Sequence, residues 1–353
     1  MSRWLKSRVS SLSRISGYQK PERYVNVLRM DTNENLALPK KFVSGIMMEA
    51  SRRTDLREYP AEQFDELRSK LSRYLNVPKE CIAAGSGSDQ ILDLLLSTFA
   101  SDGAGTVSVR PTFTFYEDRC NLHSIKMKEI ELNNDFSLNT KKLLSTTGAK
   151  ICYICSPNNP TGNQFNKETM LEVIRSFNGL VIVDEAYVEF ADYSLKDLVR
   201  KYDNLVVLRT MSKAFGLAGA RIGYMVANRK IVDLFVSTIQ YPYPMSSLSL
   251  KTASIALSKL NYVKSIIKQV RSERERVYDG INALGLTAFR SDANFVLFEV
   301  GSRYKTVYRK LIRRGVLVRD IGNIGSHKGC LRVSIGTKFM NNKFLQALKV
   351  VCR

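Results

Sequence analysis

The sequence predicts an α/β protein in which a three-layer domain with a mostly parallel sheet is joined to a smaller α+β domain. The chain has 353 residues, which at about 150 residues per domain suggests two domains, and 44% of them are hydrophobic, enough for a sizeable core. Short apolar runs alternate with amphipathic segments through residues 30–243. Even the longest runs, such as 180–183, fall far short of the roughly 18 residues that a membrane-spanning helix needs. An integral membrane protein is therefore not expected.

Residues 30–243 are predicted to form the large domain. Helical periodicity covers residues 39–51 and 61–75, and strands then alternate with helices. Strands are expected at 82–84, 106–109, 125–132, 150–154, 180–183 and 205–208, with helices at 89–99, after Pro111, near Lys141 and at 167–177. Because such an alternation forms a parallel sheet covered on both faces, the loops that follow the strands are expected to build the site.

Residues 244–353 are predicted to form the small domain. The helical stretch 247–284 is too long for one ordinary helix and is expected to bend or break near residues 260–261. The remaining elements are expected as a strand at 294–300, a helix at 304–314, strands at 316–319 and 330–335, and a helix at 341–351.

Residues 1–29 are predicted to be an N-terminal arm that belongs to the small domain. The first twenty residues carry five basic side chains and no acidic one. This composition has a weak likeness to a transit peptide. The favoured alternative is an arm that docks on another part of the fold or on a partner subunit, since no apolar core or cleavage site marks a signal peptide.

The chain is strongly basic, with 54 Lys and Arg residues against 33 Asp and Glu, a formal net charge of +21. Such a charge attracts phosphates, anionic metabolites, nucleic acid or anionic lipid, and charge alone does not choose among them. The basic residues are spread over the chain, often at helical spacing, which is typical of solvated helix faces. Nucleic acid is the less favoured partner, because no Arg-Gly-Gly repeat, zinc-finger spacing or basic heptad region occurs.

The numbers and positions of the cysteines and histidines limit which kinds of catalytic or metal site the chain can form. Six scattered cysteines do not form a disulfide framework and indicate a reducing, cytoplasmic location. Cys152 and Cys155 form a C-x-x-C, but they lie in an apolar run and are interpreted as structural, with a metal or redox site as the weaker alternative. Two histidines are too few for a Ser-His-Asp or multi-His zinc site, so no metal is expected and another base must move protons.

Three loops carry candidate site residues. The Gly-rich turn 85–89 lies between a strand and a helix, where backbone amides bind anions, although such turns are often only structural. The loop 155–162 follows a buried strand and is rich in Pro and Asn. Asp184 ends another apolar strand; it needs a cationic partner if its carboxylate is buried, or else it caps the next segment.

The loop after residue 208 adds a lysine and an arginine. Lys213 lies among apolar and cationic neighbours, a setting that depresses the pKa of an amine and makes it a nucleophile for a carbonyl, although a surface cation is the alternative. Arg221, eight residues on, is placed to bind a phosphate with its forked guanidinium.

Together these motifs carry a resemblance. Asn159-Pro-Thr-Gly, Asp184-x-x-Tyr187, Ser212-Lys213 and Arg221 resemble the fold-type I, pyridoxal-phosphate-dependent class I/II aminotransferases, in order and spacing over nearly the whole chain. Within this superfamily the segments 31–35, 58–60, 318–320 and 331–336 are similar to those of histidinol-phosphate aminotransferases.

The resemblance implies roles for the cofactor site. Lys213 would attach the cofactor and then move a proton between substrate Cα and cofactor C4′, and Asp184 would keep the pyridinium nitrogen protonated. The other implied cofactor contacts are Asn159 and Tyr187 on the ring hydroxyl, Phe113 on the ring face, and, on the phosphate, Ser88, Asp89, Ser212, Arg221 and Tyr59 of the partner subunit.

The resemblance also implies a substrate. Arg332 would bind the substrate carboxylate or the group in its place. Arg319 would bind a substrate phosphate, and Tyr18 would make a second contact with that substrate. The alternative for Arg319 is an ion pair with Asp320 or another acid. The implied enzyme is a homodimer that converts histidinol phosphate and 2-oxoglutarate into imidazole acetol phosphate and glutamate. The rivals are an aromatic amino-acid aminotransferase, a threonine-phosphate decarboxylase, and a basic nucleic-acid-binding regulator with the same fold.

Overall fold

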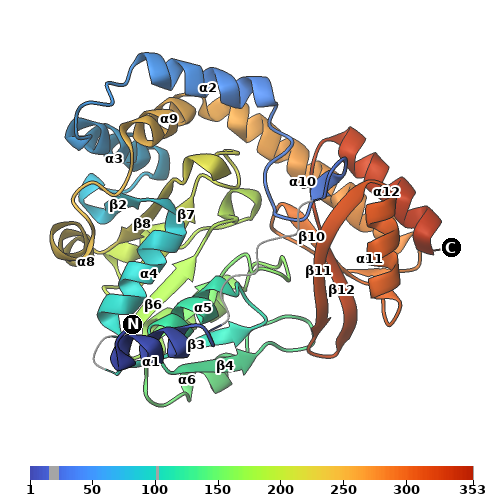
Figure 1. Ribbon diagram of the computed structural model, residues 1–353, viewed down its shortest axis with the longest axis horizontal. Coiled ribbons are helices and arrows are strands. Elements are labelled where there is room, and N and C mark those ends of the chain that lie inside the picture. Colours follow the sequence, from blue (N-terminus) through green and yellow to red (C-terminus); the bar gives the residue numbers. More distant parts are fainter. Residues whose placement is uncertain (16–23, 101–102, 353) are drawn as a thin grey trace.

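The computed structural model describes residues 1–15, 24–100 and 103–352. Its large sheet has seven strands in the order β2, β8, β7, β6, β5, β3, β4 (Figure 1). The bounds are β2 (Ile82–Gly85), β3 (Gly105–Arg110), β4 (Met127–Glu131), β5 (Ala149–Cys155), β6 (Leu180–Asp184), β7 (Leu205–Thr210) and β8 (Gly223–Ala227). Strands β3 to β7 pair in parallel and β8 pairs antiparallel to both its neighbours, which confirms the mostly parallel sheet.

Helices cover both faces of this sheet because alternate strand residues enter different cores. Ile182 belongs to the core under α4 (Gly87–Phe99), α5 (Phe115–Leu122) and α8 (Arg229–Leu234), whereas Val181 and Val183 belong to the opposite core. The further helices of this domain are α2 (Lys40–Arg52), α3 (Ala61–Leu75), α6 (Thr140–Leu144) and α7 (Lys167–Ser176). The predicted three layers are therefore present.

The small domain has a five-stranded sheet in the order β1, β11, β12, β10, β9. Its strands are β1 (Leu28–Met30), β9 (Thr287–Ala288), β10 (Phe295–Glu299), β11 (Val316–Ile324) and β12 (His327–Ser334). The helices α11 (Tyr304–Arg313) and α12 (Lys338–Cys352) lie beside it (Figure 1). β1 pairs in parallel with β11, so the chain before residue 31 contributes a strand to this sheet.

The long helical stretch is broken close to the place where a bend or break was predicted. It consists of α9 (Ser247–Ser258) and α10 (Leu260–Asn282), separated at Lys259. α10 runs from the large domain to the small one (Figure 1). Short turns of 3-10 or π helix occur at Lys79–Cys81, Val188–Phe190, Lys196–Arg200, Ala218–Ala220 and Phe235–Ile239.

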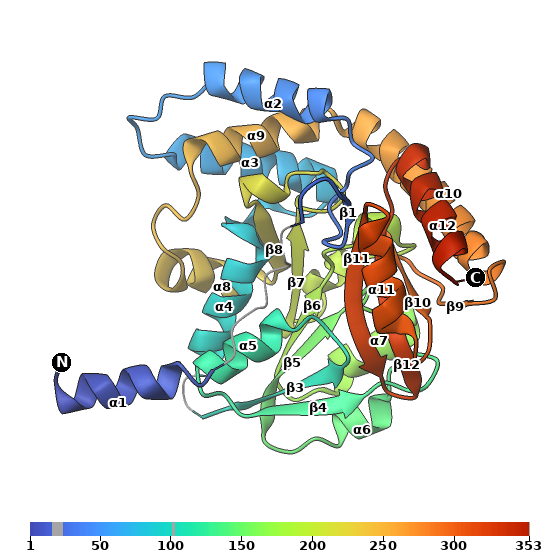
Figure 2. The same ribbon diagram turned by 45° about the vertical axis from the view of Figure 1, so that its right-hand side comes forward.

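The N-terminal helix α1 (Arg3–Leu12) extends away from both domains (Figure 2). None of its residues is buried, so within the described part of the chain the arm does not dock on its own fold. Residues 28–30 behave differently, since they join the small sheet.

Some sequence-based interpretations were incomplete. The strands β1, β8 and β9 were not predicted; β8 follows the Gly-rich loop directly, and β1 and β9 are only three and two residues long. The strands β11 and β12 extend toward their shared turn beyond the predicted ends, with bulges after Asp320 and Gly322 that bend the hairpin.

The cysteines are all free, and five of the six are buried, including Cys152 and Cys155. Burial raises the pKa of the Cys152 thiol, so this thiol is a poor ligand or redox group. In the described residues there is no group of His, Cys, Asp and Glu side chains that could hold a metal ion, and no helix there is both long and apolar enough to cross a membrane.

Candidate active site

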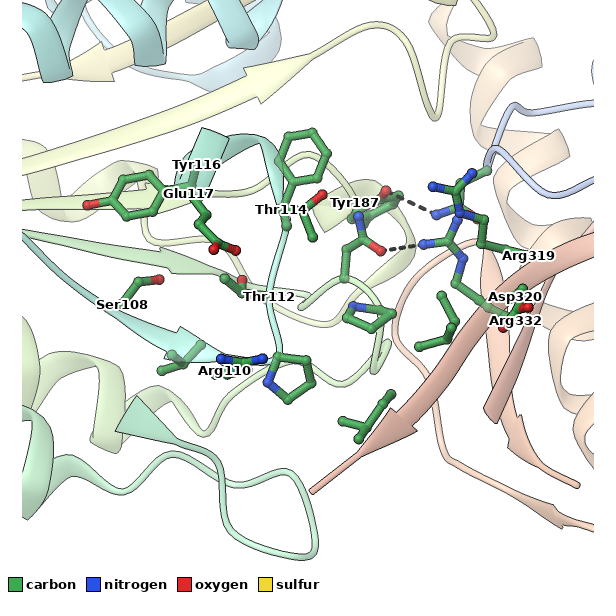
Figure 3. Close-up of a pocket in the computed structure, with 18 of the residues that line it drawn as sticks. Ser108, Arg110, Thr112, Thr114, Tyr116, Glu117, Tyr187, Arg319, Asp320 and Arg332 are labelled. Atoms are coloured by element: carbon green, nitrogen blue, oxygen red, sulfur yellow. Dashed lines mark hydrogen bonds between the residues drawn. The ribbon is translucent and has the colours of Figure 1, made fainter. Parts of the chain in front are cut away.

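Two adjoining cavities open where the carboxyl ends of the large-sheet strands meet the small sheet. The Asp184 cavity has a volume of about 280 Å³, and the Arg319 cavity, shown in Figure 3, about 370 Å³. They share four wall residues, Phe113, Asn159, Tyr187 and Lys213. Their position at the strand ends is the one that parallel sheets favour for a site.

Asp184 ends β6 and lies in the wall of the Asp184 cavity, only 4% exposed. Its Oδ2 accepts a hydrogen bond from Tyr153 Oη (3.0 Å), and its Oδ1 accepts one from the Ala186 backbone N–H (3.0 Å). The second bond is a cap for the following turn. Burial raises the pKa of Asp184 to about 6, although both hydrogen bonds favour the charged form. None of the ion pairs within the described residues includes this carboxylate.

Lys213 lies between the two cavities, in the loop after β7. Its Nζ donates a hydrogen bond to the Thr32 carbonyl oxygen (3.2 Å) and lies 5.5 Å from the centre of the Tyr187 ring. Burial, together with the positive charge of Arg332, lowers the pKa of Lys213 to about 8. A substantial fraction of this amine is therefore neutral near pH 8 and can attack a carbonyl.

An anion-binding cradle lies at the start of α4. Ser88, Asp89, Ser212 and Arg221 line this end of the Asp184 cavity, and the first turn of α4 contributes backbone N–H groups. Arg221 Nη2 donates to Asp89 Oδ2 at 2.7 Å. Ser212 Oγ accepts from Thr210, which leaves its own proton to donate.

Two glycines make this cradle possible. A Cβ on Gly87, where φ is +82°, would lie 2.7 Å from Arg221 Nη2, and a Cβ on Gly223 would collide with the backbone of Gly87 and Ser88. Only glycine lets β8 and the guanidinium approach the helix start this closely.

Tyr187 and Asn159 are held by a network that reaches the small sheet. Asn33 Nδ2 donates to Tyr187 Oη at 3.1 Å, and the Tyr187 ring meets Phe295 edge-on at 5.2 Å. Arg332 Nη1 donates to Asn159 Oδ1, which leaves the amide Nδ2 of Asn159 as the donor. Both side chains are therefore fixed before any ligand enters.

Arg332 and Arg319 project from β12 and β11 into the Arg319 cavity (Figure 3), and their Cα atoms are partners in the strand register. Arg332 also donates to the Asp31 carbonyl oxygen (2.9 Å) and lies over the Phe295 ring. Asp320 pairs instead with Lys305, at 2.7 Å, so the alternative of an Arg319–Asp320 ion pair is wrong.

One predicted site residue, Tyr59, lines neither cavity of its own chain, and another lies outside the described residues. Tyr59 is 78% exposed, stacks on Tyr243 with ring centres 4.6 Å apart, and lines neither cavity of its own chain. Tyr18 lies outside the described residues. Phe113 does lie at the site, in the wall that both cavities share.

Several supporting residues of the site could not be recognised in the sequence. Asn33, which belongs to a motif that was noted, was given no role, yet it holds Tyr187 and receives a hydrogen bond from Asn294 at its carbonyl oxygen. Tyr153 was interpreted only as part of an apolar strand, yet it binds Asp184. Arg209 lies in a buried cluster behind the site, 3.3 Å from Glu185 and 3.8 Å from Glu189.

The fold and this site define an aminotransferase. The chain belongs to the class I and II aminotransferases, since residues 25–348 match that family. It is 34% identical to the histidinol-phosphate aminotransferase of Ruminiclostridium cellulolyticum, over 99% of this chain and 98% of that protein. It is 37% identical to the enzyme of the same name from Pyrococcus furiosus, over 91% of each chain.

A solved structure shares this fold. The histidinol-phosphate aminotransferase of Sinorhizobium meliloti, in complex with pyridoxal-5'-phosphate, superposes with a TM-score of 0.85 at 25% identity, covering 92% of this chain and 90% of that one. The expected fold-type I architecture is thus confirmed.

The residues of the Asp184 cavity fit pyridoxal phosphate. The buried Asp184 carboxylate has no ion-pair partner in the described residues, and a protonated ring nitrogen would supply the missing positive charge. The cradle of α4 amides, Ser212 and Arg221 suits a phosphate, and Lys213 is the amine that an aldehyde requires.

We predict that Lys213 takes up the cofactor with an unusual pH dependence. In cofactor-free enzyme, the rate of pyridoxal phosphate attachment should rise with pH around a midpoint near 8, because only the neutral amine reacts and the pKa of Lys213 is about 8. Stopped-flow absorbance measures the rate, and borohydride reduction followed by peptide mass spectrometry locates the modified lysine.

Two variants control this measurement. Lys213→Ala should give no reduced adduct, and Arg332→Met should move the midpoint upward because it removes a neighbouring positive charge. An adduct on another lysine, or a midpoint at the ordinary lysine value, would contradict the assignment.

Proposed function

We propose that this enzyme transfers the amino group of histidinol phosphate to 2-oxoglutarate with pyridoxal phosphate as cofactor, giving imidazole acetol phosphate and glutamate. The curated relatives that align over nearly the whole chain carry the name of this activity. The observation that carries the proposal is Arg319, a cation in the wall of the cavity that adjoins the cofactor site.

Arg319 has the surroundings of an anion-binding residue. It is only partly exposed, and no acidic side chain of the described part of the chain forms an ion pair with it. Its register partner Arg332 places a second guanidinium on the same cavity. Two like charges on neighbouring strands repel unless an anion lies near them, and a doubly charged phosphate with three acceptor oxygens suits this pair.

Lys213 would transfer the proton, and Arg332 would bind the substrate. When bound, pyridoxal phosphate supplies a ring that accepts the electron pair of the broken Cα–H bond. The Lys213 amine, whose pKa is lowered, lies between the two cavities. There it can accept the proton from substrate Cα and deliver it to C4′ of the cofactor. Arg332 binds the α-carboxylate of glutamate, or the group that replaces it in histidinol phosphate.

We further propose that the active unit is a cytoplasmic homodimer. Tyr59 is exposed and lines neither cavity of its own chain, which suits a residue that completes the phosphate site of a second copy. Other large apolar side chains are exposed close to Tyr59 or to its stacking partner Tyr243 in the sequence, namely Leu56 and Tyr241. The six free cysteines suit a reducing compartment.

We predict that Arg319 selects the phosphorylated substrate. Arg319→Ala should lower kcat/KM for histidinol phosphate by an amount equivalent to about 2 to 5 kcal/mol of activation free energy, the range for losing one partner of a charge pair, here one that the bound substrate would cover. Arg319→Lys should recover only part of this, because lysine lacks the bidentate geometry. Glutamate turnover should change far less. Steady-state kinetics of both half-reactions measure these effects.

The control for Arg319 is Arg313→Ala, which removes the same charge from an exposed position on α11. This variant should behave like the wild type. If Arg319→Ala retained its full preference for histidinol phosphate, the phosphate assignment would be wrong.

We predict that Tyr59 acts across the dimer. Tyr59→Phe should weaken cofactor retention by about 1.5 to 3 kcal/mol, the strength of a hydrogen bond to a charged acceptor. A mixed dimer of one Lys213→Ala chain and one Tyr59→Phe chain should then hold its covalently bound cofactor as tightly as the wild type. In that dimer the only site with Lys213 receives the unchanged Tyr59 of the other chain.

Retention in the mixed dimer is measured by dialysis and cofactor absorbance. Retention as weak as in the Tyr59→Phe homodimer would show that Tyr59 acts within its own chain. A fully active monomer would overturn the dimer proposal as well.

A further inference from the structure

Tyr153 is a fully buried residue that is hydrogen-bonded to Asp184 of the cofactor site. It lies on β5, lines neither cavity, and donates its hydroxyl to Asp184 Oδ2 at 3.0 Å. In the strand register Tyr153 is opposite Ile182, two residues before Asp184. Residues two apart on a strand share a face and lie about 7 Å apart, so a side chain as long as tyrosine is needed to reach the carboxylate.

The position of this phenol is fixed from two sides. The Tyr153 ring stacks on the Tyr116 ring, with centres 4.2 Å apart and planes within 9° of parallel. Ser108 Oγ donates to the Tyr153 backbone oxygen at 2.9 Å and ties β5 to β3. The hydroxyl therefore meets Asp184 in a fixed direction.

We propose that Tyr153 is a positioning residue that acts through Asp184: its hydroxyl turns the carboxylate toward the cavity and withdraws negative charge from it, so that the proton shared with the cofactor ring stays on the ring nitrogen. Together with the Ala186 N–H, it gives each carboxylate oxygen one protein donor. The lone pairs that remain are then available to a ligand in the cavity.

The chemistry of the phenol suits this role. Burial raises the pKa of Tyr153 well above its usual value, so the hydroxyl stays protonated and acts as a donor at every working pH. A neutral donor makes a carboxylate less basic without adding a charge of its own. If the donor were lost, Asp184 would become more basic and would draw the shared proton away from the ring nitrogen.

This role concerns the cofactor site alone and does not depend on which amino donor the enzyme prefers. The first readout therefore uses the holoenzyme without substrate, and the second uses glutamate rather than the proposed phosphorylated donor. Pyridoxal phosphate labelled with ¹⁵N in its ring reports the protonation of that nitrogen by NMR. In Tyr153→Phe the ¹⁵N resonance should move from the protonated toward the unprotonated position, and the rate of the half-reaction with glutamate should fall about 10- to 100-fold at an unchanged KM.

A matched control separates this effect from loss of packing. Tyr224 is an equally buried tyrosine in the same sheet, on β8, and lines neither cavity. Tyr224→Phe also removes one buried hydroxyl, but it should leave the ¹⁵N resonance and the rate where they are in the wild type. An unchanged resonance in Tyr153→Phe would show that Tyr153 only packs, and would overturn the proposal.

A second substitution should shift the ¹⁵N resonance in the opposite direction and leaves no cavity in the core. Replacement of Tyr153 by 3-fluorotyrosine keeps nearly the same volume and makes the phenol a more acidic, stronger donor. The ¹⁵N resonance should then move further toward the protonated position. A shift in the same direction as Tyr153→Phe, or none, would contradict the proposal even if Tyr153→Phe failed to fold.

Discussion

The site depends on a buried carboxylate that lacks a positive partner in the described part of the chain. Asp184 lies at the end of a central strand, is almost inaccessible, and is held by two neutral donors. Removing a charge from water is costly unless it is paired, and the cost appears here as a pKa raised to about 6. A ligand with a protonated ring nitrogen would relieve this cost, because it brings the positive partner that the buried carboxylate needs.

The other features of the site follow from the same arrangement. Strands β5, β6 and β7 run in parallel, so the loops that carry Asn159, Asp184 and Lys213 come together at one edge of the sheet. The antiparallel strand β8 brings Gly223 against the start of α4, where Arg221 closes the anion cradle. The small sheet contributes Arg319 and Arg332 to the wall of the Arg319 cavity.

Much of this could be predicted from the sequence, because charged residues directly after apolar strands stand out. Asp184 and Lys213 were found in this way. Tyr153 could not be found, since a tyrosine within an apolar strand is usually a core residue and only the strand register brings its hydroxyl to Asp184. The pairing of Asp320 with Lys305 depends on how α11 packs beside β11, which no local pattern shows. The proposed role of Tyr59 would involve a second chain, which the sequence of one chain does not show.

The central claim is that the Arg319 cavity selects a phosphorylated amino donor. The most direct test is the kcat/KM of the wild-type enzyme with 2-oxoglutarate as acceptor, measured in parallel for histidinol phosphate, histidinol, threonine phosphate, tyrosine and phenylalanine. Histidinol phosphate should be the best donor, and histidinol, which lacks only the phosphate, should be far poorer. A higher kcat/KM for tyrosine or phenylalanine, or equal values for histidinol phosphate and histidinol, would contradict this account.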